Sequence, residues 1–225
     1  ALDGKTNVAV NASSVNSISE TIANLNTAYN SAGISGLGNE NISVTNTGTI
    51  NATQVNDLLG ETSGTITFVG SGNLAITMTS GQTLDLSGIT NSLSGNLSIT
   101  DSTGNETIIG TSANDTLTLS SGNDTVNLGD GSDVINVTIG NLDISDNISD
   151  NGVSGTDTLN ITNSGTIDSA NLIDVSGIET LNLSASNDTI TFDDTTKFNE
   201  FRDNFTDIVD AGGNDTLSFG STAVS

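Results

Sequence analysis

The chain has 225 residues with 27 acidic and 3 basic side chains, which gives a formal net charge of −24, and it contains neither His nor Cys. This charge excludes nucleic acid as a natural partner, because phosphate binding needs clustered Lys and Arg, and an anionic membrane surface would repel the chain. Without His and Cys there is no Ser-His-Asp triad and no thiol nucleophile, so the sequence predicts a protein that is not an enzyme and whose obvious counter-charge is a divalent cation.

Apolar residues make up 33% of the chain and aromatic residues 3%, yet the apolar residues recur with a regular period. Such a period indicates an ordered chain with a core of stacked Ile, Leu, Val and Ala side chains. A solenoid fits this composition, since each coil contacts only its neighbours. No apolar run approaches the roughly 18 residues of a membrane span, which predicts no membrane insertion.

Residues 1–57 are expected to form a tandem repeat unit. Residues 1–6 (ALDGKT) read like residues 57–62 (DLLGET), which indicates a segment cut from a longer array. Helical spacing predicts an amphipathic helix over about 14–30, with an inward stripe made of Val15, Ile18, Ile22, Leu25 and Tyr29. Ser17–Glu20 has capping-box form and supports that helix start. Binding of a partner by the same stripe is the alternative.

A second internal echo links residues 44–50 (VTNTGTI) with residues 161–167 (ITNSGTI). Each copy is expected to be a short strand followed by a helical turn. The inward side chains of these turns would be Val55, Leu58 and Leu172.

Residues 58–100 alternate apolar and polar positions as strands do, with glycine and serine at the corners. The segment 71–77 (SGNLAIT) returns at 94–100 (SGNLSIT). This repetition predicts successive coils of a parallel β-helix. Leu97 stands where the following lines carry an acid, so these coils are expected to form without a bound ion.

Residues 101–136 can be written without gaps as four nine-residue lines: DSTGNETII, GTSANDTLT, LSSGNDTVN and LGDGSDVIN. The sixth position is a carboxylate in every line, namely Glu106, Asp115, Asp124 and Asp133. The eighth position is always aliphatic, namely Ile108, Leu117, Val126 and Ile135. The acidic position and the aliphatic position therefore both recur every nine residues.

This pattern resembles the calcium-binding nonapeptide of the RTX (repeats-in-toxin) family, G-G-x-G-x-D-x-U-x, where U is a large apolar residue. Glycine fills the fourth position at Gly104, Gly122 and Gly131, whereas Ala113 replaces it in the second line. The leading glycine pair survives only in part, and Glu106 is one methylene longer than the family's Asp.

The resemblance implies that six residues of each line form a turn, that three form a strand, and that two lines complete a coil. Glu106 should then stack on Asp124, and Asp115 on Asp133. Carboxylate and carbonyl oxygens between stacked turns would form a calcium cage with 6–8 oxygen ligands. The alternative is that Asn-Asp-Thr is only turn chemistry. Four acids in phase favour calcium.

Residues 137–153 are expected to form an acidic loop that carries Asp143, Asp146 and Asp150. Two interpretations stay open for it. The acids either face water in a solvated excursion or hold a further cation in a less regular cage.

Residues 154–225 are predicted to resume the solenoid with isolated acidic turns. Phe198, Phe201 and Phe205 stand at helical spacing, continued by Ile208, and predict a short helix over 196–205 that leans on the coils. Lys197 and Arg202 are expected to pair with acids on its other face. The complete set of predicted metal-binding residues is Glu106, Asp115, Asp124, Asp130, Asp133, Asp157, Asp188 and Asp215.

The expected fold is all-β, a parallel β-helix or β-roll solenoid that is continuous over these segments, with a few short helices packed against it. The sequence of residues 178–186 resembles sequences in surface-layer proteins of Gram-negative bacteria and in exported cyanobacterial repeat proteins. The family resemblance implies an extracellular, type I secreted protein that binds several Ca²⁺ ions.

Three functions remain open. The favoured one is a structural segment of a surface layer, extracellular filament or adhesin stalk, which associates with copies of itself or neighbouring repeats. The second is an ice- or glycan-binding adhesin module, in contact with cell-surface polysaccharide. Against it, the rows of Thr and Asn at equivalent positions of successive repeats in residues 101–136 are short. The third is a fragment of a polysaccharide-modifying enzyme, against which the lack of His argues.

Overall fold

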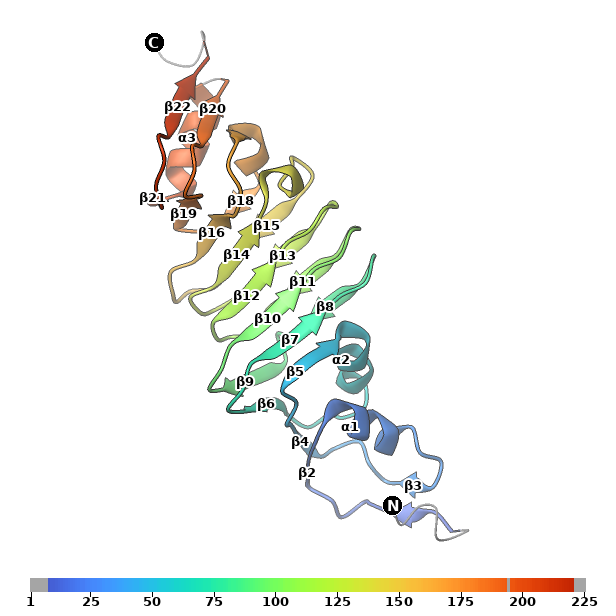
Figure 1. The fold of residues 1–225 in the computed structure, drawn as a ribbon. Coiled ribbons are helices and arrows are strands. Elements are labelled where there is room, and N and C mark those ends of the chain that lie inside the picture. Colours follow the sequence, from blue (N-terminus) through green and yellow to red (C-terminus); the bar gives the residue numbers. More distant parts are fainter. Residues whose placement is uncertain (1–7, 194, 221–225) are drawn as a thin grey trace. The chain divides into compact units, whose positions relative to one another are not determined.

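The structure is a computed structural model that describes residues 8–193 and 195–220 (Figure 1). The chain forms two compact units: Ala1–Thr77 with Gly88–Leu97, and Met78–Ser87 with Ser98–Ser225. They are called the first and the second unit below. The echo predicted at residues 1–6 lies outside the described residues. None of the helices that the structure describes is long and apolar enough to cross a membrane.

The first unit is built from parallel strands and two helices. One sheet contains β2 (Ser17–Glu20), β4 (Asn41–Val44), β6 (Ile66–Gly70) and β9 (Ile89–Leu93). Parallel pairs also join β1 (Val10–Asn11) to β3 (Ile34–Ser35) and β5 (Gly48–Asn51) to β7 (Leu74–Thr77). The helices are α1 (Ile22–Tyr29) and α2 (Ala52–Leu59).

The helix predicted over 14–30 begins only at Ile22. Ser17–Glu20 is strand β2, paired in parallel with β4, so the predicted capping box at Ser17 was wrong. Backbone hydrogen bonds to a strand that lies 24 residues away override the local helical spacing of the apolar residues. Ile22 and Leu25 of the predicted stripe are buried in the core.

A capping box was predicted at Ser17–Glu20, but the structure has one at the start of helix α2. The Asn51 side chain accepts a hydrogen bond from Gln54 N at 2.9 Å, and Asn51 N donates to Gln54 Oε1 at 3.2 Å. Val55 and Leu58 are buried, as predicted. The echo of this motif is β17 (Thr166–Asp168) followed by the short helix η3 (Ser169–Leu172), where Leu172 is also buried.

The second unit stacks short parallel strands in three sheets. One contains β10 (Leu97–Thr100), β12 (Asp115–Thr118), β14 (Val134–Val137), β16 (Thr158–Ile161), β19 (Thr180–Leu183) and β21 (Asp207–Asp210). Another contains β8 (Thr83–Asp85), β11 (Thr107–Ile109), β13 (Thr125–Asn127), β15 (Asn147–Ser149) and β18 (Val175–Ser176). The third joins β17 to β20 (Thr189–Phe192) and β22 (Thr216–Phe219). All the strand pairings given for the described residues are parallel, which confirms the predicted fold class.

The strand register confirms that two nonapeptides complete one coil. Ile108 pairs with Val126, and Leu117 pairs with Ile135. These four aliphatic side chains are at most 1% exposed, so the eighth position of each line forms the core. Burial of each side chain contributes roughly 1.5–3 kcal/mol relative to exposure.

Residues 137–153, which were expected to form a loop, instead continue the coils. They contain the short helix η2 (Ile139–Asn141) and strand β15, which pairs with β13 on one side and β18 on the other. The acidic segment is thus a longer coil. Its hydrogen bonds span 22 to 24 residues where those of the nonapeptides span 18.

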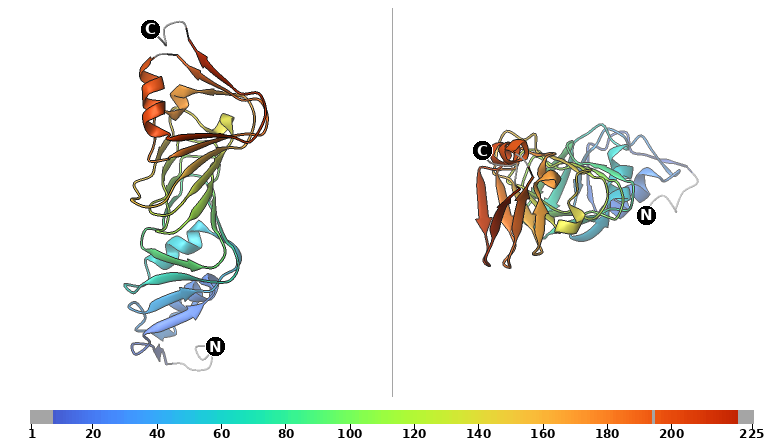
Figure 2. Two further views of the ribbon diagram at one scale, coloured as in Figure 1. Left: turned by 90° about the vertical axis from the view of Figure 1, so that its left-hand side faces the viewer. Right: turned by 90° about the horizontal axis from the view of Figure 1, so that it is seen from above.

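Helix α3 (Thr195–Asn204) confirms the helix predicted over 196–205. The Phe192 ring lies 5.2 Å from that of Phe198 and 5.1 Å from that of Phe201, so the aromatic stripe packs on β20. The ribbon of helix α3 lies beside the last coils of the second unit (Figure 2). Ile208 does not continue that stripe, because it lies in β21 and is 40% exposed. Arg202 pairs with Asp203 at 3.0 Å on the surface, whereas the Lys197 side chain lies outside the described residues.

Candidate metal centre

Seven acids of the second unit stack in two columns, each at the residue before a strand or, for Asp115, at the first residue of its strand. We call the column in front of β11, β13 and β15 the first edge, and the column in front of β12, β14, β16 and β19 the second edge. The first edge contains Glu106, Asp124 and Asp146, and the second contains Asp115, Asp133, Asp157 and Glu179.

After the first acid of each column, each acid accepts a hydrogen bond from the backbone N–H of the acid one coil before it. On the first edge, Glu106 N donates to Asp124 Oδ1 at 2.8 Å. On the second edge, Asp115 N donates to Asp133 Oδ1, and Asp133 N to Asp157 Oδ1, both at 2.7 Å. The predicted stacking of Glu106 on Asp124 and of Asp115 on Asp133 is confirmed. In Asp124 and Asp133 this bond fixes Oδ1, and Oδ2 is buried without a hydrogen-bond partner and so is left for a ligand.

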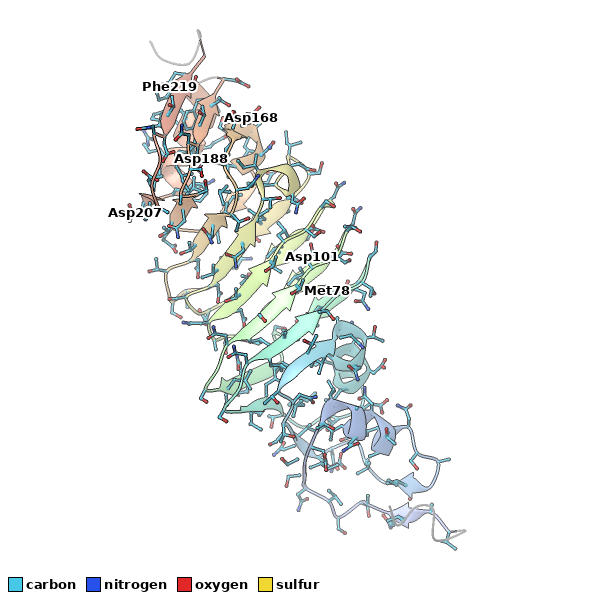
Figure 3. The ribbon with its side chains drawn as sticks, viewed as in Figure 1. Met78, Asp101, Asp168, Asp188, Asp207 and Phe219 are labelled. Carbon is cyan, nitrogen blue, oxygen red and sulfur yellow. The ribbon has the colours of Figure 1, made fainter. Side chains whose placement is uncertain are left out.

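The first-edge cluster consists of Asp101, Glu106 and Asp124, each of which offers an oxygen within 4.8 Å of the others (Asp101 is labelled in Figure 3). The three side chains are 7%, 1% and 0% exposed. Asp101 Oδ1, Glu106 Oε2 and Asp124 Oδ2 are buried and have no hydrogen-bond partner. Glu106 Oε1 accepts from Gly81 N, which lies 25 residues earlier in the chain, at 2.6 Å. Each acid of this cluster therefore has a buried oxygen without a partner, and the three carboxylates lie close enough to share one ion.

Sequence reasoning missed Asp101, which stands outside the sixth-position column. The available signal was its place in the first position of the first line, where the other lines carry Gly or Leu.

The second-edge cluster consists of Asp133, Asp150 and Asp157, again with one oxygen each within 4.8 Å of the others. The structure therefore brings together two predicted residues and one acid, Asp150, whose role the sequence left open. The oxygens Asp133 Oδ2 and Asp150 Oδ2 are buried without a partner. Gly155, at φ 114°, brings its turn so close to the preceding one that an added Cβ would overlap the Gly131 carbonyl oxygen.

Two of the predicted residues have carboxylates that are already bonded within their own turn. Asp115 Oδ2 accepts from Thr111 N at 2.6 Å and from Thr111 Oγ1 at 3.0 Å. Asp188 Oδ2 accepts from Ser184 N at 2.9 Å and from Ser184 Oγ at 2.7 Å. In both turns the hydroxyl residue stands four positions before the acid, a spacing that Ser102 and Ser120 share with the cluster acids Glu106 and Asp124, so the sequence does not signal this arrangement.

Asp130 and Asp215 also lie outside the two clusters. Asp130 Oδ1 accepts from Val153 N at 2.7 Å and so orders the following turn. Asp215 Oδ1 accepts from Asp188 N at 2.8 Å, while its Oδ2 is buried without a partner. Among the described residues, the groups of three acids that could hold an ion are therefore the two clusters above.

No basic residue stands near the buried acids in the sequence to balance their negative charge, because no Lys, Arg or His occurs between Lys5 and Lys197. Burial raises the pKa of Asp133 to about 8 and the pKa of Asp101 to about 7. The same cause raises the pKa of Asp115 and that of Asp157 to about 6. Unpaired buried carboxylates are costly, so these sites favour either protons or a cation.

Comparison with known proteins gives one match. Residues 100–135 fit the family model of the RTX calcium-binding nonapeptide repeat, in four copies. No curated protein and no solved structure matches the chain. The match confirms the resemblance. RTX nonapeptide repeats bind calcium, and the acidic clusters supply the hard oxygen ligands that this ion takes.

Proposed function

Because residues 100–135 carry four RTX calcium-binding nonapeptide repeats, we propose that the chain is a calcium-stiffened structural segment of a large secreted cell-surface protein. In this proposal, ions join adjacent coils and set the rigidity of a surface layer, an extracellular filament or an adhesin stalk. The observation that carries it is that Glu106 and Asp124, which stand one coil apart, lie in one cluster of acids and each have a buried oxygen without a partner.

A calcium ion between two coils acts as a cross-link that exists only in the folded chain. The stacked carboxylates repel one another without the ion, and the ion reverses the sign of that interaction. Extracellular modules bind calcium with dissociation constants of about 10⁻⁴ to 10⁻³ M. At millimolar calcium each ion then stabilises the fold by roughly 0.4–1.4 kcal/mol. Such weak sites are filled outside a cell and empty inside it.

Composition supports the extracellular part of the proposal. RTX repeats are typical of secreted proteins, the chain lacks Cys, and its acidic surface suits a medium rich in divalent cations. Type I secretion belongs to the same proposal.

Self-association with copies of the chain or with neighbouring repeats also belongs to it. In the described residues, β21 and β22 each stand last in their sheets, and Ile208, Leu217 and Phe219 on these strands are 40%, 52% and 42% exposed. An edge strand offers unpaired backbone groups to a further strand.

The ice- or glycan-binding alternative gains no support from the Asn ranks. Asn105 Oδ1 accepts from Asn123 N at 3.0 Å, and Asn114 Oδ1 accepts from Ser132 N at 2.9 Å. The carbonyl oxygens of these side chains join adjacent coils. A structural role accounts for them without a further ligand.

Single-molecule stretching tests the proposed function. The full chain, placed between identical marker domains, should unfold at a clearly higher force in 2 mM calcium than in chelator, because the ions cross-link coils that otherwise separate one by one. Asp124→Asn should lose a large part of this gain. The matched control, Asp57→Asn, changes an exposed acid of α2 and should keep all of it. Equal unfolding forces with and without calcium would rule out the stiffening role.

A further inference from the structure

We propose that Asp133, Asp150 and Asp157 form a second calcium site, which lies at the junction between the nonapeptide repeats and the longer coil that follows them. It goes beyond the repeat-bound calcium described above, because Asp150 and Asp157 lie outside the matched residues 100–135. Its geometry also differs, since Asp133 N bonds to an acid 24 residues away where the nonapeptide acids are 18 apart.

Two of its ligands have free oxygens deep in the protein. Asp133 is 1% exposed and Asp150 is 9% exposed, and the Oδ2 atom of each lacks a hydrogen-bond partner. Their Oδ1 atoms are held by Asp115 N and Gly152 N, each at 2.7 Å. Both side chains are therefore fixed in direction, and each keeps one oxygen for a ligand.

The spacing of the oxygens fits calcium. Two oxygens that each lie about 2.4 Å from one ion can be at most about 4.8 Å apart. One oxygen from each of the three carboxylates lies within 4.8 Å of the others. A single ion can therefore contact all three with little movement of the side chains, and carbonyl or water oxygens can complete its shell.

The site has a route for the ion and its water. A cavity of about 170 Å³ opens beside Asp150 and Asp157 and is also lined by Gly177 and Glu179. Glu179 Oε2 accepts from Asp157 N at 2.8 Å, so a fourth carboxylate stands at this opening. The negative charge of the opening favours a divalent cation over any anion.

Calcium titration calorimetry on the full chain tests the site. The wild-type chain should bind one more ion than Asp150→Asn, and Asp124→Asn should lose a different ion, so that the double variant loses both. Asp57→Asn should bind as many ions as wild type. If Asp150→Asn binds the wild-type number with unchanged affinity, the second site is overturned while the proposed function stands. If the wild-type chain binds no calcium, both fail.

A measurement on the wild-type protein covers the case in which Asp150→Asn does not fold. The amide resonances of Gly152 and Gly155 should shift on titration with calcium and saturate at millimolar concentration. Their failure to move, while the amide of Gly122 at the first edge shifts, would overturn the second site.

Discussion

Calcium at 5 mM should raise the melting temperature of the second unit by on the order of 10 °C relative to calcium-free buffer. An ion with a dissociation constant near 10⁻⁴ M contributes roughly 2 kcal/mol at this concentration, and two ions contribute about twice that. A unit of this size gains a few degrees per kcal/mol. Circular dichroism in calcium and in EDTA measures the change.

The first unit provides an internal control for this experiment. In its described residues no group of three acids could hold an ion, so its transition should not depend on calcium. Magnesium should replace calcium poorly, because it demands near-ideal octahedral geometry and gives up its water reluctantly. Identical melting curves in calcium and EDTA would contradict the account.

The calcium gain should increase with pH. Burial raises the pKa of Asp133 to about 8 and that of Asp101 to about 7, so the calcium-free fold retains protons that the unfolded chain has lost. Stability from these groups is present at low pH and is lost as the pH rises from about 4 to about 8. Calcium competes with those protons. Its effect on melting temperature should be smaller at pH 5.5 than at pH 8, and a gain that is independent of pH would contradict this role of the acids.

Substitution of Gly155 by alanine should destabilise the second unit by roughly 2–5 kcal/mol, from overpacking together with backbone strain. Its φ of 114° disfavours any side chain, and the new Cβ would overlap the carbonyl oxygen of Gly131 in the turn below. Denaturant unfolding in calcium measures the loss.

Gly140→Ala is the matched control, since nothing lies within 4 Å of the position of its added Cβ. It should change the free energy of unfolding by well under 1 kcal/mol. Equal stability of the two variants would show that the turns of the second edge are not as closely stacked as described.

The nonapeptide coils could be predicted because equivalent positions of the four repeats have the same structural role. The sixth residue of each line carries the acid and the eighth fills the core, so the period alone gives the register that pairs Ile108 with Val126. Strand β15 could not be recognised in this way. It is three residues long with one buried side chain, Ile148, and its partners lie more than 20 residues away in both directions.

The spacing of the apolar residues also led to a wrong prediction for the start of α1. Ile18 follows the helical period of Ile22 and Leu25, but it lies in β2 and pairs with Ile42. Only the parallel neighbour decides between helix and strand for such a short segment. By contrast, the true capping box at Asn51 and Gln54 was readable from sequence and was overlooked.

The acids of the candidate sites were only partly predictable. The repeat identifies Asp124 and Asp133, but it has no column for Asp101 or Asp150, which join the clusters from other positions of the coil. It also suggests equal roles for Asp115 and Asp124, although the Thr111 hydroxyl and backbone N–H already hold the Asp115 carboxylate. Three-dimensional convergence determines which acids can share an ion.

Anomalous diffraction from crystals grown in calcium is the most direct test of the central claim. The account predicts one peak among Asp101, Glu106 and Asp124 and another among Asp133, Asp150 and Asp157, each with 6–8 oxygen atoms at about 2.3–2.6 Å. Water at both positions, with no anomalous signal, would contradict it.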